Sequence, residues 1–191
     1  ITGNAAGDNF GCSVSTAGDI NNDGYDDIII GAHSKNSIQG AAYVIYAGEK
    51  STMMDIGLSS TTLNPLTTGF MIIGNAVGDY FGVSVRKAGD INKDGYDDII
   101  IGASAKNTAY VIYGGAKSAM SNIFLSSTTL NPSSTGFVIT GNAVGDDLGF
   151  SVSTAGDTNN DGYDDIIVGA GYKNSDHGAA YIIYGNILFI D

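Results

Sequence analysis

Residues 19–27 read Asp-Ile-Asn-Asn-Asp-Gly-Tyr-Asp-Asp, and nearly the same nine residues recur at 90–98 and 157–165. Each copy has oxygen-bearing side chains at positions 1, 3, 5 and 9 around a glycine at position 6. Calcium takes about six to eight oxygen ligands at about 2.3–2.6 Å, and carboxylates, amides and backbone carbonyls supply them. The sequence therefore predicts three calcium sites, one in each loop.

The ligands follow from the spacing, because alternate residues of a sharply curving loop direct their oxygens inward. We expect the side chains at positions 1, 3, 5 and 9 to bind the ion together with the backbone carbonyl of the tyrosine at position 7, while the glycine allows the turn. The aspartate at position 8 should point elsewhere. The expected ligands are Asp19, Asn21, Asp23, Tyr25 and Asp27 in the first loop, Asp90, Asn92, Asp94, Tyr96 and Asp98 in the second, and Asp157, Asn159, Asp161, Tyr163 and Asp165 in the third.

Two other interpretations compete with this one. An EF-hand loop begins in the same way, but it ends in a bidentate Glu at position 12 and lies between two helices. Position 12 here is Ile30, Ile101 or Val168, and the flanking runs are β-branched and aromatic, which is typical of strands. Asn-Asp-Gly is also an ordinary hairpin turn that needs no metal. Three copies favour the metal, because uncompensated carboxylates repel one another.

The loop belongs to a longer unit that recurs three times, and each unit predicts up to four strands. The run that follows the loop is too continuously apolar for a strand with one face in water, so it should be buried on both faces. Short strands repeated in this way are typical of propeller blades. The predicted strands include 14–17, then 27–32, 98–103 and 165–170, then 42–46, 109–113 and 180–184, and finally 69–73 and 136–140.

We therefore predict an all-β fold of propeller-type blades, each built from four antiparallel strands. The repeats cover residues 1–74, 75–141 and 142–191, and the third is incomplete. Two Ser/Thr-rich stretches, 48–68 and 115–135, should be solvated connections between third and fourth strands. O-glycosylation of these stretches is a hypothesis that rests on their composition alone.

The order of motifs resembles a known family. An aromatic residue with glycine (Phe10-Gly11, Phe81-Gly82), the D-x-[DN]-x-D-G-x-x-D loop and Ile-Ile-Ile-Gly-Ala resemble the FG-GAP repeat. This repeat occurs in integrin α-subunit β-propellers and in large bacterial or algal extracellular proteins. The resemblance covers nearly the whole chain, although Leu148 replaces the phenylalanine in the third unit and the final proline of the motif is absent. It implies calcium at the hairpin between the first two strands of each blade.

Composition narrows the class of partner. The formal net charge is −12, but 12 of the 20 acidic residues lie in the three loops, and three calcium ions would halve that charge. We expect no nucleic-acid partner, which would call for a basic stripe, and no membrane insertion, because no apolar run reaches 18 residues. The single cysteine, Cys12, stands where the other repeats have Val83 and Phe150, which predicts a small buried apolar side chain.

The two ends of the sequence predict self-association or continuation of the same chain. Residues 1–4, Ile-Thr-Gly-Asn, match residues 139–142, so the chain opens inside a fourth strand, and residues 186–191 follow a third strand. A closed propeller needs about four to eight blades. Head-to-tail association of copies closes a ring or builds an open array.

The leading functional hypothesis is an extracellular or cell-surface module with an adhesive or surface-structural role, in which calcium is structural and the partner is another extracellular protein or a glycan. The alternative is a building block of a self-assembling fibre or surface layer with no separate ligand. An enzyme is not expected, because His33 and His177 occupy different places in their repeats and neither has a recurrent Ser or Cys nearby.

Overall fold

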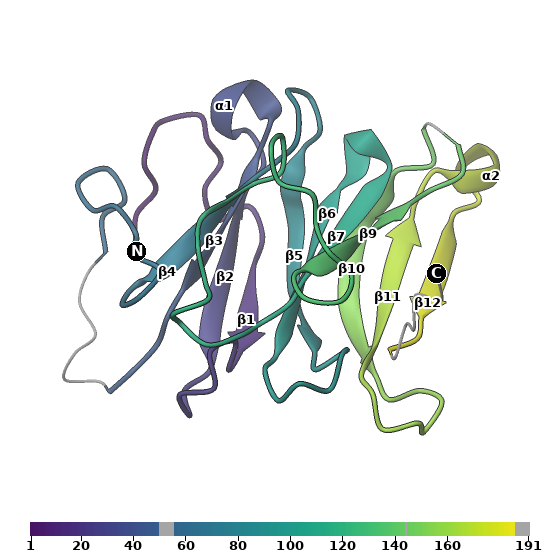
Figure 1. Ribbon diagram of the computed structural model, residues 1–191. Helices are drawn as coiled ribbons and strands as arrows, with labels where there is room; N and C mark the ends of the chain where they lie inside the picture. The colour runs from purple at the N-terminus through teal and green to yellow at the C-terminus, as the bar shows by residue number, and fades with distance from the viewer. Residues whose placement is uncertain (50–55, 144, 186–191) are drawn as a thin grey trace.

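The computed structural model describes residues 1–49, 56–143 and 145–185, and the structural statements below refer to these residues. Residues 186–191, one of the two ends on which the expectation of self-association or chain continuation depends, lie outside the described residues. Three β-sheets stand side by side in a row, each contributed mainly by one repeat (Figure 1). The all-β prediction with one sheet in each repeat is confirmed.

The strands of the first two repeats follow the predicted order, with four antiparallel strands in each repeat. The first sheet contains β1 (Val14–Gly18), β2 (Asp27–Ala32), β3 (Ala41–Ile45) and β4 (Gly69–Ile73), with β8 (Ile123–Phe124) added at its edge. The second contains β5 (Phe81–Gly89), β6 (Asp98–Ala103), β7 (Thr108–Ile112) and β9 (Gly136–Thr140). The third contains β10 (Leu148–Gly156), β11 (Asp165–Ala170) and β12 (Ala179–Ile183).

Single helical turns join the second and third strands, and the sequence did not predict them. They are α1 (Lys35–Ile38), the 3-10 turn η1 (Ser104–Lys106) and α2 (Lys173–Asp176). In each repeat a lysine at this turn forms an ion pair with the aspartate of the Gly-Asp step 27 residues earlier, with N–O distances of 3.1–3.6 Å. These pairs join the start of each repeat to its far turn: Lys35–Asp8, Lys106–Asp79 and Lys173–Asp146.

The second strand of each repeat is largely buried, as its apolar run predicts. Every residue of β6 is buried, because the second sheet lies between the other two. One apolar layer joins the first sheet to the second, and another joins the second sheet to the third. The sheets therefore pack through their faces and share continuous cores, which is how propeller blades are stabilised.

The Ser/Thr-rich connections are more than solvated linkers. Leu58, Leu63 and Leu125 are buried, and β8 lies within the second connection and pairs in parallel with β4 of the preceding repeat. The exposed Ser and Thr residues surround these apolar anchors. The expectation of a purely solvated connection is therefore wrong, since each connection carries leucines that pack against a sheet.

One further expectation, the burial of Cys12, needs correction. Cys12 is exposed, because it lies in the turn before β1 rather than in the strand, where its thiol donates to the carbonyl oxygen of Gly82 at 3.6 Å. His33, which directly follows β2, is half-buried, and its ring stacks on Tyr80 with 5.6 Å between centroids. Burial lowers the pKa of His33.

Candidate metal centre

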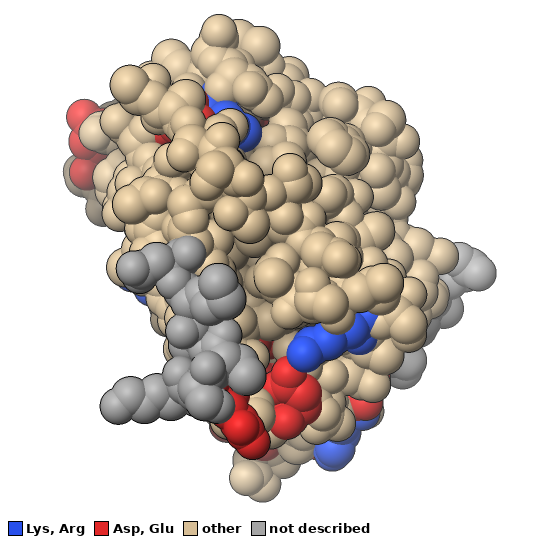
Figure 2. All heavy atoms as spheres, turned by 90° about the vertical axis from the view of Figure 1, so that its left-hand side faces the viewer, with Lys and Arg blue, Asp and Glu red and all other residues tan. Residues whose placement is uncertain are grey.

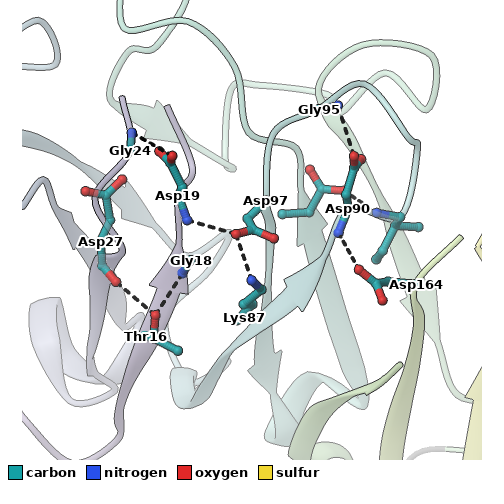
Figure 3. Close-up of polar contacts among 12 residues, drawn as sticks. Thr16, Gly18, Asp19, Gly24, Asp27, Lys87, Asp90, Gly95, Asp97 and Asp164 are labelled. Atoms are coloured by element: carbon teal, nitrogen blue, oxygen red, sulfur yellow. Dashed lines mark hydrogen bonds and ion pairs between the residues drawn. The ribbon is translucent and has the colours of Figure 1, made fainter. Parts of the chain in front are cut away.

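The three acidic loops connect the first and second strands of their repeats, at the lower end of the sheets in Figure 1. The aspartate at position 1 folds each loop by accepting two backbone hydrogen bonds. In the first loop, Asp19 Oδ1 accepts from the N–H of Asp23 at 2.9 Å, and Oδ2 accepts from the N–H of Gly24 at 2.8 Å (Figure 3). Asp90 and Asp157 make the same pair of contacts. Gly24 has φ +90°, which only glycine adopts without strain.

The aspartate at position 5 also takes part in the turn. Asp23 Oδ1 accepts from the N–H of Tyr25 at 3.1 Å, and Asp94 and Asp161 repeat this contact at 3.0 Å. Asp23 Oδ2 lies 2.7 Å from Nζ of Lys117, an ammonium group that the second repeat supplies to the first loop. The ammonium group of Lys117 therefore places a positive charge beside the first loop.

The asparagine at position 3 differs between the loops. Asn92 and Asn159 turn their amide oxygens toward the N–H groups of Asp94 and Asp161, at 3.1 and 3.0 Å. Asn21 instead donates to Asp27 Oδ2 at 2.9 Å, and its own Oδ1 is buried without a hydrogen-bond partner. A buried carbonyl oxygen without a hydrogen-bond donor destabilises the folded state. A cation bound in the loop would supply the partner that Oδ1 of Asn21 lacks.

The aspartate at position 9 is fully buried in all three repeats. One of its oxygens accepts from the backbone N–H just beyond the third strand, at 2.8–2.9 Å, and these donors are Ala47, Gly114 and Gly185. In the second and third repeats the other oxygen accepts from the N–H at position 2 of the loop, from Ile91 at 2.9 Å and from Thr158 at 2.7 Å. This aspartate thus joins the loop to the sheet, a role that the ligand pattern did not predict.

Two opposing effects set the pKa values of the aspartates at position 9: burial raises them, and the hydrogen bonds that these aspartates accept lower them. Burial raises the pKa of Asp27 to about 7 and that of Asp98 to about 8, and neighbouring loop carboxylates add to both shifts. Burial also opposes ionisation of Asp165, but hydrogen bonds led by the Thr158 hydroxyl outweigh it and lower the pKa. A divalent cation beside these loops would favour the ionised carboxylates.

In the second and third repeats, the aspartate at position 8 points away from its own loop and reaches the preceding repeat. Asp97 Oδ2 accepts from the backbone N–H of Asp19 at 2.8 Å and from Lys87 at 2.7 Å (Figure 3). Asp164 Oδ2 accepts from the N–H of Asp90 at 2.9 Å. Position 8 therefore links neighbouring loops into one row.

The tyrosines at position 7 lie at the outer rim of the loops. Tyr25 is 41% exposed, Tyr96 is half-buried, and the ring of Tyr163 lies 5.0 Å from Nζ of Lys93 in the preceding loop. Among residues 1–49, 56–143 and 145–185, no three Asp, Glu, His or Cys side chains converge as they would around a bound ion. The donors are nonetheless all oxygen atoms, and the unpartnered Oδ1 of Asn21 fits a hard cation.

Three face-packed antiparallel sheets, each with an acidic hairpin at the same end, define a β-repeat protein of the propeller class. Residues 10–45, 81–114 and 148–183, together more than half of the chain, match the FG-GAP repeat. The chain belongs to the FG-GAP repeat family. Its repeats are of the kind found in integrin alpha subunits.

Individual integrin chains show the same relationship. Integrin alpha-7 of Mus musculus is 31% identical over 176 residues, which cover 89% of this chain and 13% of the integrin. Integrin alpha-V of Gallus gallus is 28% identical over 184 residues, covering 89% of this chain and 16% of the integrin. Integrin alpha-IIb of Mus musculus is 32% identical over 167 residues. The chain thus spans less than a fifth of the length of these relatives. Within the described ranges, no helix has the length and apolar character to cross a membrane.

Proposed function

We propose that this chain is a calcium-stabilised, non-enzymatic FG-GAP module that serves adhesion or surface structure outside the cell, with calcium as part of the architecture. The observation that carries the proposal is the buried, unpartnered Oδ1 of Asn21 in a loop with carboxylates at positions 1, 5 and 9. An ion at this place would satisfy that oxygen and neutralise the carboxylates around it.

A structural role for calcium is supported by what the loops hold together. Position 9 joins each loop to the end of the third strand, through Asp27, Asp98 and Asp165. Position 8 joins the second and third repeats to the loop before them. An ion that holds one loop rigid would therefore also strengthen the contact with its neighbour.

Urea denaturation with excess calcium and with EDTA tests this proposal. A ligand that binds only the folded state stabilises it by RT ln(1 + [L]/Kd), which is about 2.7 kcal/mol for each site at a free concentration of 100 Kd. We expect a higher urea midpoint in calcium, and a smaller effect of magnesium at the same concentration, because magnesium demands a stricter octahedral geometry. An identical midpoint in calcium and in EDTA would reject calcium as a structural ion.

A fibre or surface layer is the second candidate function. It is favoured by the outer sheet of the third repeat, where Ile182 is 48% exposed and Tyr184 is 53% exposed. Exposed apolar groups on a sheet face invite contact with another protein surface. Electron microscopy of the purified protein in calcium tests this candidate, which predicts ordered arrays, whereas dispersed single particles would contradict it.

A further inference from the structure

The same groups form the contact between the first and second repeats and the contact between the second and third repeats. The hydroxyl of Ser13 accepts from the N–H of Val85 at 3.1 Å, and the hydroxyl of Ser84 accepts from the N–H of Val152 at 3.2 Å. These hydrogen bonds add to those of Asp97 and Asp164 with the loops before them. The first and second repeats thus each present a serine hydroxyl and a loop N–H to the following repeat, which supplies a valine N–H and an aspartate carboxylate.

Two glycines in each of the first two repeats lie directly against the following repeat. A Cβ on Gly31 would lie 2.0 Å from the carbonyl oxygen of Gly82, and a Cβ on Gly102 would lie 1.8 Å from that of Gly149. In the same way, a Cβ on Gly18 or Gly89 would collide with the position-8 aspartate of the following repeat, at 2.2 and 2.3 Å. At Gly31 and Gly102 the neighbouring repeat occupies the space of a side chain, while Gly18 and Gly89 also have positive φ values of +71° and +87° that favour glycine.

The third repeat carries the same groups with no described residue upon them. A Cβ on Gly156 would have no heavy atom within 4 Å, and the nearest atoms to a Cβ on Gly169 belong to Ser151 of its own repeat at 3.5 Å. We define the tail face by Ser151, Gly156, Ile167, Gly169, Ile182 and Tyr184. It is a contact surface of the same design as the two that are buried.

Side-chain exposure identifies the apolar part of the tail face. Val44 and Val111 are fully buried under the following repeat, whereas their counterpart Ile182 is 48% exposed. Tyr46 and Tyr113 are likewise buried, whereas their counterpart Tyr184 is 53% exposed. The tail face thus exposes side chains that the other repeats bury.

The first repeat carries the complementary surface. Val85 and Val152 are buried against the preceding repeat, at 0% and 3% exposure, but Val14 is 60% exposed. Asp26, the counterpart of Asp97 and Asp164, is exposed. We define the head face by Gly11, Val14, Asp26 and Ile28. Figure 2 shows this side of the molecule, where uncharged atoms predominate and acidic side chains lie at the lower end and at the upper left edge.

Residues 1–4 lie where the fourth strand of a preceding sheet would lie. The N–H of Leu58 donates to the carbonyl of Thr2 at 3.0 Å, just as the N–H of Leu125 donates to the carbonyl of Ile73 in β4 at 3.1 Å. The third sheet has β12 at its edge, where β4 and β9 complete the other two sheets. Residues 1–4 thus have the place of a fourth strand, and the edge of β12 is the place where the other two sheets pair with theirs.

We propose that the tail face binds the head face of a second copy of this chain, with Ile1–Gly3 of that copy pairing along β12. The register of β3 with β4 and of β7 with β9 then places Ala179 opposite Thr2 and Ala180 opposite Ile1. Asp26 of the second copy accepts from the N–H of Asp157, and its Gly11 carbonyl fits against Gly169. This proposal concerns assembly and does not rest on calcium binding.

Light scattering on a size-exclusion column, with a pair of one-sided variants, tests the proposal. Val14→Asp puts a charge into the apolar part of the head face and leaves the tail face intact. Ile182→Asp puts a charge into the tail face and leaves the head face intact. We expect the unchanged protein to form dimers or larger assemblies, and each variant alone to be monomeric. An equimolar mixture of the two variants should give a complex of one copy of each, because the intact tail face of Val14→Asp can bind the intact head face of Ile182→Asp.

Four controls make the result specific. Val77→Asp makes the same substitution at a residue that is 70% exposed and outside both faces, and it should assemble like the unchanged protein. A reductant excludes a disulfide between copies through the exposed Cys12. Circular dichroism checks that the variants are folded, and runs in calcium and in EDTA separate assembly from metal binding. An unchanged protein that stays monomeric would overturn the proposal, and so would single variants that still assemble or a mixture that forms no complex.

Discussion

Gly102→Ala is expected to lower the free energy of unfolding by about 3 kcal/mol, because overpacking a close contact costs roughly 1–3 kcal/mol or more. The added Cβ would lie 1.8 Å from the carbonyl oxygen of Gly149, and the obstacle is backbone, which no rotamer change can move. The second and third sheets would have to separate to admit one methyl group. Urea denaturation followed by circular dichroism measures the loss.

The third repeat supplies the matched control. Gly169 has the same place in its strand, but its nearest neighbours lie 3.5 Å from the added Cβ, so Gly169→Ala should leave the stability of the monomer unchanged or slightly higher. Gly31→Ala, at 2.0 Å from the carbonyl oxygen of Gly82, should behave like Gly102→Ala. Equal losses at Gly102 and Gly169 would mean that the cost comes from the strand itself, and would contradict packing between repeats as its cause.

Most of the fold could be predicted from the sequence, because its signals are local and occur three times. The apolar run 98–103 lies between polar loops, and only a strand covered on both faces suits it, as β6 is. The single turns such as α1 escaped prediction because Asn36 and Ser37 adopt left-handed φ values that no pattern of apolar residues encodes. β8 was missed because its partner, β4, lies in the preceding repeat.

The loop was easier to predict than its surroundings. The turn made by Asp19 and Gly24 follows from residues within five positions of each other, so spacing alone indicates it. The role of Asp97 depends on a backbone N–H 78 positions earlier, and no local pattern reveals such a contact. One signal was present in the sequence, since an aspartate recurs at position 8 with no role in the ligand pattern.

Asp98→Ala is expected to lower the free energy of unfolding by about 3 kcal/mol even in EDTA. Its two oxygens accept from the backbone N–H groups of Gly114 and Ile91, both at 2.9 Å, and the side chain is fully buried. Each buried donor that loses its acceptor costs about 1–3 kcal/mol. Because these hydrogen bonds join loop to sheet without any ion, removing calcium should not remove the loss.

Asp94→Ala separates this structural role from metal binding. Asp94 is exposed and accepts from the N–H of Tyr96 at 3.0 Å, so in EDTA its loss should cost no more than about 1 kcal/mol. In calcium the variant should also lose the stabilisation contributed by the second site, whereas Asp98→Ala loses both contributions together. Urea midpoints of the two variants and the unchanged protein, each in EDTA and in calcium, give the comparison. A calcium increment in Asp94→Ala as large as in the unchanged protein would exclude Asp94 as a ligand, and a mild Asp98→Ala in EDTA would show that the buried hydrogen bonds do not hold the loop to the sheet.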